Sequence, residues 1–229
     1  MSNRNIINSQ LYKILRYGYF FLVSNLLFLI ANSLFLFVFI MIPPQLESLV
    51  FYLVALLPMG PALTALFFSM GVLVRTGDLA PVKDFIRSYR DNFIVSMKYW
   101  LLQLLLSAIM LVDAVYFFNQ DFKIIAAVFL LLFVLINLFS LIGFPLLATF
   151  EITVRNVYRA TVVIIWRYPV KQLINLLTLI AFVIIFWAFP SELFLFLFSL
   201  MAFYVMRQDQ EIFKELASQF SETASEGEI

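Results

Sequence analysis

The side chains of this sequence that could do chemistry are few, and several lie within long apolar segments. Asp113 is the one carboxylate well inside such a segment, and an ionisable group there is a candidate for proton or ion transport. It also lies about a turn and a half from the end of its segment, where it could reach water or pair with Lys123. Four amides could line a polar pathway or could form hydrogen bonds between helices: Asn25, Asn32, Gln103 and Asn137.

A candidate helix break lies in the middle of the second apolar segment, at Pro58, Gly60 and Pro61. Each proline lacks a backbone N–H, so the carbonyls of Val54 and Leu57 lose their helical partners. Freed carbonyls within a membrane can coordinate a substrate or an ion, as in transporters with broken helices. The alternative is a packing kink whose carbonyls are satisfied by neighbouring side chains. The sequence leaves both interpretations open.

Several kinds of site have no counterpart in the sequence. The chain has no cysteine and no histidine, which excludes disulfides, thiolate metal sites and Ser-His catalysis. It has no phosphate-binding loop, no dinucleotide-binding glycine pattern and no nucleophile elbow. We therefore expect no enzyme activity, no cofactor, no metal and no bound nucleotide. The net charge of +1 gives no indication of a nucleic-acid partner.

The composition determines the class of protein that must position these residues. Hydrophobic residues make up 64% of the 229 positions and charged residues only 13%, against about 25% in an average soluble domain. So little polar surface predicts an all-α polytopic helix bundle in a lipid bilayer. Segments near the 20 apolar residues needed to cross it predict six spans in one transmembrane domain, 1–206, followed by a cytoplasmic tail, 207–229. The spans are 20–42, 48–74, 94–118, 124–150, 172–189 and 191–206, the last two joined by a tight turn at Pro190.

The basic residues indicate which way these spans face. Under the six-span arrangement, 14 of the 15 lysines and arginines lie on the side of the two termini, and only Lys123 lies on the other. The positive-inside rule then places both termini in the cytoplasm. The connections on the outer side are short, so no external domain is expected.

The cytoplasmic connections have the helical spacing of amphipathic helices. In the first, Phe85 and Tyr89 lie on the apolar face, and Arg87 and Arg90 lie on the polar face. The second repeats the pattern with Arg155 and Arg159 on its polar side. Such helices could anchor on anionic lipid or could dock on a partner protein. Both possibilities remain open from the residues alone.

The segment 58–92 resembles the YesL family of bacterial integral membrane proteins. The resemblance rests on the sequence PALTALF at 61–67, on Asp78, Phe85 and Phe93, and on the later basic segment at 155–168. Members of this family have no established function and are commonly encoded beside carbohydrate-uptake ABC transporters. The resemblance therefore implies the bacterial plasma membrane and a possible association with sugar ABC permease subunits. It implies no catalytic residue.

Two functions follow as hypotheses. The first is a non-catalytic accessory subunit that aids the assembly, stability or regulation of a carbohydrate ABC permease. The alternative is a small transporter or channel for a glycan fragment, based on the broken second span and the intramembrane amides. The chain lacks the cytoplasmic Glu-Ala-Ala segment of an ABC permease, so energy coupling would have to come from another protein.

Overall fold

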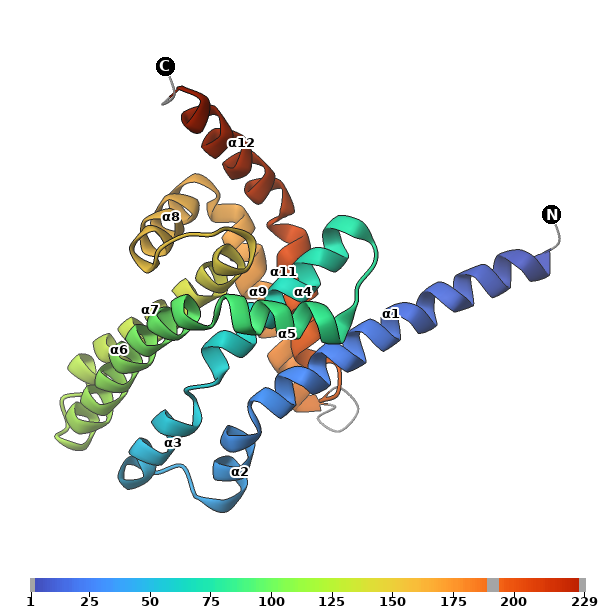
Figure 1. Cartoon of the computed structure of the whole chain (residues 1–229). Coiled ribbons are helices and arrows are strands. Elements are labelled where there is room, and N and C mark those ends of the chain that lie inside the picture. The colour runs from blue at the N-terminus through green and yellow to red at the C-terminus, as the bar shows by residue number, and fades with distance from the viewer. Residues whose placement is uncertain (1–2, 189–193, 227–229) are drawn as a thin grey trace.

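The computed structural model describes residues 3–188 and 194–226, and within these ranges the chain is helical with no strand (Figure 1). Five of its helices are long and apolar enough to cross a membrane. This confirms the predicted all-α, multi-pass membrane bundle. The five segments are Gln10–Ala31, Met59–Thr76, Phe93–Asn119, Lys123–Thr149 and Pro169–Ala188.

The first predicted span, 20–42, is not one continuous helix. The chain instead forms α1 (Asn3–Ala31), which starts well before Phe20, and the short α2 (Ser33–Met41). Asn32 separates them with non-helical dihedral angles, φ −102° and ψ 18°. The buried Asn32 side chain turns back and donates its amide to the Phe28 carbonyl at 2.8 Å, which competes with the backbone bonds of a regular helix.

The second predicted span, 48–74, is also divided. After a 3₁₀ turn (Leu46–Ser48), α3 (Leu49–Ala55) ends and α4 (Met59–Thr76) begins on the far side of Pro58. The helix is interrupted here because Pro58 and Pro61 cannot donate backbone hydrogen bonds. Gly77 ends α4 in the left-handed region at φ 72°, which only glycine adopts without strain.

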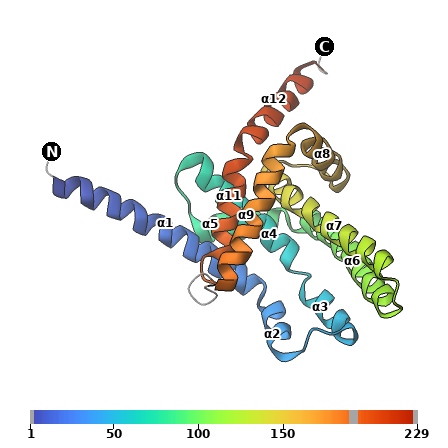
Figure 2. The same ribbon diagram turned by 180° about the vertical axis from the view of Figure 1, so that it is seen from behind.

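The centre of the bundle is α4, most of whose side chains are buried. The long helices α6 (Phe93–Asn119) and α7 (Lys123–Thr149) pack against α4 and against each other as an antiparallel hairpin. Between α4 and α6 lies the amphipathic α5 (Pro81–Asp91), and between α7 and α9 (Pro169–Ala188) lies the amphipathic α8 (Val154–Arg167). Figures 1 and 2 show α2 and α3 at one end of the molecule and α8 at the other.

The sixth predicted span, 191–206, begins outside the described residues, as does the predicted turn at Pro190. What the structure describes is α11 (Leu197–Gln208), whose 12 residues rise only about 18 Å. That length is too short to cross about 30 Å of hydrocarbon. The chain nevertheless returns to the end of the bundle where α8 lies, because α12 (Gln210–Glu226) is bonded to the α8–α9 corner through Glu211 and Glu215.

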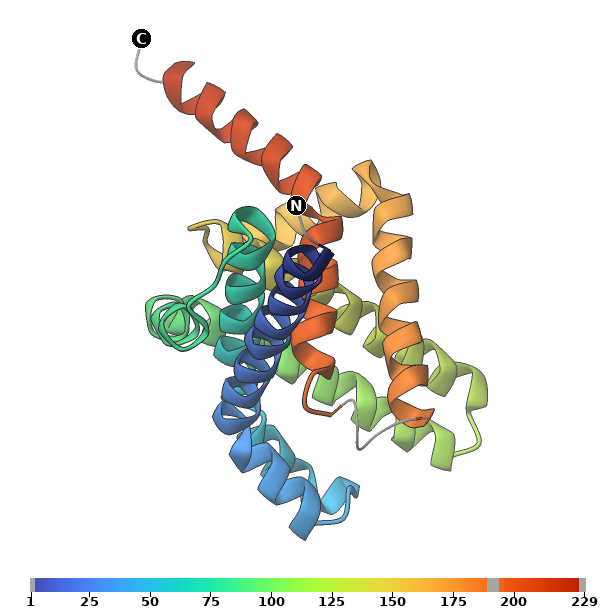
Figure 3. The ribbon, with the colours of Figure 1, turned by 90° about the vertical axis from the view of Figure 1, so that its right-hand side faces the viewer.

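The predicted tail, 207–229, is helical as far as Glu226, and its first turn belongs to the core. Ile212 and Phe213 are 1% and 7% exposed. Figure 3 shows the rest of α12 leaving the bundle at the end opposite to α2. Two exposed tryptophans, Trp166 and Trp187, lie close to the two ends of α9. This is the usual position of aromatic residues at the two membrane–water interfaces.

Candidate functional site

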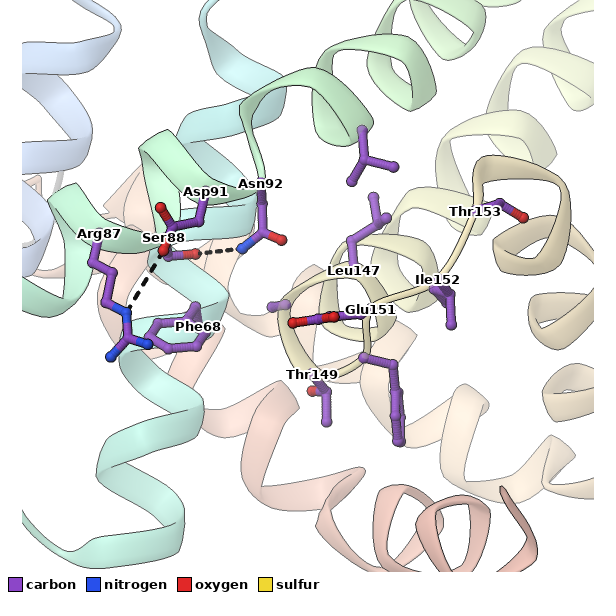
Figure 4. Close-up of a pocket in the computed structure, with 13 residues that line it drawn as sticks. Phe68, Arg87, Ser88, Asp91, Asn92, Leu147, Thr149, Glu151, Ile152 and Thr153 are labelled. Atoms are coloured by element: carbon purple, nitrogen blue, oxygen red, sulfur yellow. Dashed lines mark hydrogen bonds and ion pairs between the residues drawn. The ribbon is translucent and has the colours of Figure 1, made fainter. Parts of the chain in front are cut away.

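A polar cavity with a volume of about 640 Å³ lies between α5 and the connection from α7 to α8 (Figure 4). Phe68 of α4 and Val95 of α6 contribute apolar side chains to it. The polar side chains come from two directions. Arg87, Ser88, Asp91 and Asn92 belong to α5 and its end, and Thr149, Glu151 and Thr153 follow from the end of α7.

The α5 side of the cavity is built by the way that helix is positioned. Its buried residues Pro81, Phe85 and Ser88 face the bundle, and the Ala80 backbone N–H donates to Asp84 at 2.9 Å. Holding this face inward turns Arg87 outward, so that its side chain is 68% exposed. Its Nε lies 3.6 Å from Asp91 Oδ2, which is the i, i+4 geometry expected for these residues.

The opposite side is formed by extended backbone rather than helix. α7 ends at Thr149, and both Phe150 and Thr153 have extended dihedral angles before α8 begins. Glu151 and Arg155 are four residues apart, a spacing at which two oppositely charged residues of one helix would pair. They do not, because Glu151 lies in this extended connection and Arg155 lies in α8. Within the described ranges Glu151 forms no ion pair, so an exposed carboxylate borders the cavity opposite Arg87.

The other predicted docking residues separate into two groups. Phe85 is buried at 4% exposure and Tyr89 stacks on it at 6.2 Å between ring centroids, so these two rings hold α5 to the bundle. Arg90 is exposed and lies 3.6 Å from Asp91 without lining the cavity. Arg155 and Arg159 are exposed on α8, away from its buried residues Val157, Thr161 and Ile164. Arg87 is therefore the only predicted docking residue on the cavity wall.

The predicted intramembrane amides do not converge. Gln103 donates to the Tyr99 hydroxyl at 3.0 Å, and Asn137 donates to Ser107 at 3.1 Å. Asp113 is half-buried near the C-terminal end of α6, and among the residues the structure describes it has no hydrogen bond or ion pair, including with Lys123. Gln103 and Asn137 thus form separate local contacts, and Asp113 joins neither of them.

Asn25 has a more specific position. Its Oδ1 accepts the backbone N–H groups of Phe198 and Ser199 at 3.0 and 3.2 Å, and its Nδ2 donates to the Phe194 carbonyl at 2.9 Å. A helix leaves its first N–H groups without internal partners, and inside a membrane no water replaces them. The α1 side chain thus caps α11, which allows this short helix to begin within the bundle.

At the predicted break near Pro58, a backbone carbonyl is bonded by Trp100, a residue that sequence reasoning missed. Trp100 of α6 donates its indole N–H to the Leu56 carbonyl at 2.7 Å. A Cβ on Gly60 would lie 2.3 Å from the Trp100 Cβ, so glycine is needed for this approach. Tyr99 precedes Trp100 on α6, and a Cβ on Gly143 would lie 2.0 Å from the Tyr99 hydroxyl oxygen.

A sequence signal for this stripe exists. Ser96, Tyr99, Trp100 and Gln103 recur at spacings of three and four along α6, and all are buried. Ser96 donates to Thr64 of α4 at 2.8 Å. In an otherwise aliphatic helix, polar and aromatic residues at this spacing indicate one face that packs inside the bundle.

Comparison with known proteins covers one part of the chain. Residues 21–114 match the family model described as "Protein of unknown function, DUF624". The DUF624 match runs from Phe21 in α1 to Ala114 in α6 and so includes the helix break and α5. It comprises less than half of the chain and does not include the α7–α8 side of the cavity. No curated protein and no solved structure matches the sequence.

Proposed function

We propose that this chain is a non-catalytic accessory protein of the bacterial plasma membrane that docks, through its cytoplasmic cavity, on a carbohydrate-uptake ABC permease. Its role would be the assembly, stability or regulation of that permease. The choice of partner rests on the resemblance of residues 58–92 to the YesL family, which lies within the segment matched by the DUF624 model. The choice of surface rests on the cavity.

The observation that carries the proposal is the distribution of charge around the cavity. Arg87 with Asp91 on one side and Glu151, which forms no ion pair within the described residues, on the other give the cavity a rim that carries both charges. Such a rim suits a partner segment that carries both acidic and basic residues, because complementary charges fix register and reject wrong partners. Phe68 and Val95 add apolar lining that such a segment could bury.

The alternative is a small transporter or channel, and the geometry gives it less support. A pathway needs polar groups that converge and remain available to a substrate. The Leu56 carbonyl at the helix break is occupied by Trp100, and Asn25 is occupied as a helix cap. We therefore place the function at the cytoplasmic face rather than in the middle of the bilayer.

Co-purification tests the proposal. The tagged protein is extracted from its native membrane in mild detergent, and the eluate is identified by mass spectrometry. A permease subunit in the eluate is the expected result. In parallel, the protein alone is reconstituted in liposomes with labelled oligosaccharide. Uptake by the protein alone, with no permease in the eluate, would favour the transporter.

Two variants of α5 make the test specific to the cavity. Arg87→Glu places a carboxylate on the cavity wall, where a partner's acidic group would meet like charge, and the permease should be lost from the eluate. Arg90→Glu makes the same charge change one turn away, on a side chain that does not line the cavity. It should retain the complex. Equal retention by both variants would exclude the cavity as the contact.

A further inference from the structure

A buried carboxyl lies at the junction of α9, α11 and α12. Asp209 separates α11 from α12 and is 1% exposed, which makes it the one buried acidic or basic residue among those whose burial the structure describes. A buried charge is costly unless it is paired and fully hydrogen-bonded. Asp209 is not on the cavity wall and has no part in the proposed docking.

The hydrogen bonding of this carboxyl is incomplete. Asn175 of α9, also 1% exposed, donates Nδ2 to Asp209 Oδ1 at 3.0 Å. The other oxygens of the same two side chains, Asp209 Oδ2 and Asn175 Oδ1, are buried and have no partner in the part of the chain that is described. Both atoms are acceptors when Asp209 is ionised. Protonation of Asp209 removes the buried charge and supplies a donor.

The junction is the first of three polar contacts between α12 and the α8–α9 corner. Asn175–Asp209 is followed by Lys171–Glu211 at 2.6 Å and then by Arg167 and Tyr168, which both donate to Glu215. From one contact to the next, the residue numbers fall from 175 to 167 on α9 and α8 and rise from 209 to 215 on the side of α12, so the two segments run antiparallel. We call these three contacts the ladder. Glu211 is 82% and Glu215 is 40% exposed, and exposed ion pairs contribute only about 0–1 kcal/mol. Among these polar contacts the buried one therefore contributes most, beside the buried side chains of Ile212 and Phe213.

We propose that Asp209 and Asn175 form a proton-binding site, and that the proton bound there keeps α12 docked on the α8–α9 corner. When the proton is released to the cytoplasm, the ionised carboxylate is left in a buried place with one hydrogen bond. Undocking of α12 exposes it to water and relieves that cost. The cytoplasmic end of the protein thereby changes shape with pH.

The surroundings of Asp209 make it the group that responds to pH. Burial raises its pKa to about 6, against the opposing effects of the Asn175 hydrogen bond, the nearby Gln172 amide and the Lys171 charge. Lys171 faces it from α9 and already pairs with Glu211, whose pKa it lowers. On the other elements packed here, Arg16 of α1 pairs with Asp78, and Arg75 of α4 lines a separate cavity with Lys214. Arg207, on α11 itself, is exposed.

Distance measurement between two spin labels tests the proposal directly. The chain has no cysteine, so labels can be placed at Val163→Cys on α8 and Ala217→Cys on α12, both exposed positions. In lipid nanodiscs, the docked distance should dominate at pH 5. A second, longer distance should grow as the pH rises, with its midpoint near 6. A single distance that does not change from pH 5 to 8 would overturn the proposal.

Two further variants identify the group that binds the proton. Asp209→Asn keeps the size of the side chain but cannot ionise, so α12 should stay docked at every pH. Glu215→Gln weakens an exposed contact of the same ladder, so the longer distance should appear at a lower pH while the response to pH persists. A pH transition that persists in Asp209→Asn would assign the response to another group and refute the site.

Discussion

The indole N–H of Trp100 donates to the carbonyl of Leu56 at 2.7 Å, across the interface between α6 and the broken second span. The same carbonyl accepts the Met59 backbone N–H at 3.1 Å, so the indole is its second donor at the break. Phenylalanine at position 100 should keep most of the packing but leave this carbonyl without the indole, at a cost of about 1 kcal/mol. Chemical unfolding in detergent measures that loss. Trp187→Phe, at an 87% exposed position, should have little effect.

Gly60 and Gly143, which lie directly against Trp100 and Tyr99 of α6, should tolerate no side chain. Gly60→Ala places a Cβ 2.3 Å from the Trp100 Cβ, which is fixed to the backbone, so the helices must separate. A cost of about 1–3 kcal/mol or more is expected from overpacking. Gly143→Ala meets the Tyr99 ring instead, and Tyr99→Leu in the same chain should recover part of the loss.

Gly18→Ala is the matched control for this pair, because nothing lies within 4 Å of a Cβ at that position in α1. It should unfold at or slightly above the wild-type temperature, since alanine favours helix over glycine by about 0.5–1 kcal/mol. Equal thermal stability of the Gly60 and Gly18 variants would contradict the close approach of α4 and α6.

Removing the Asn25 cap should release the start of α11. Asn25→Ala leaves the N–H groups of Phe198 and Ser199 without their acceptor, and the loss of a cap costs about 1–2 kcal/mol. Hydrogen exchange, read by mass spectrometry, should accelerate at the first turn of α11 and much less in α6. Asn119→Ala, at an exposed position, should leave exchange in α11 unchanged.

The stability of the protein should fall as pH rises through about 6. The pKa of Asp209 is raised from 3.8 to about 6, so the folded state binds the proton more tightly than the unfolded chain does. This contribution is fully present below about pH 4 and is lost progressively until the pH reaches the folded pKa; it amounts to about 3 kcal/mol over that whole range, about half of it above pH 5. Melting curves should show a higher Tm at pH 5 than at 7.5. Asp209→Asn should reduce that difference, and an unchanged difference would contradict the assignment.

Cysteine labelling in intact cells should establish the orientation. Gln120→Cys, in the exposed turn between α6 and α7, should react with an impermeant thiol reagent. Lys83→Cys, exposed on α5, should react only after the cells are opened. The reverse pattern would invert the orientation derived from the basic residues.

The sequence by itself determined the membrane class, the helical fold and the approximate positions of α6, α7 and α9. Long apolar segments carry this information locally, because a bilayer requires each spanning backbone to satisfy its own hydrogen bonds. The two prolines also predicted where the second span breaks, since the missing N–H groups are properties of those residues.

Only the tertiary structure decided which partners complete these local features. Trp100 fills the break, and Asn25 caps a helix about 170 residues further along the chain. The docking role expected for Phe85 does not hold, because one face of an amphipathic helix can be buried by lipid, by a partner or by its own bundle. Likewise the burial of Asp209 depends on α9 packing against α11, and no periodicity around position 209 encodes it.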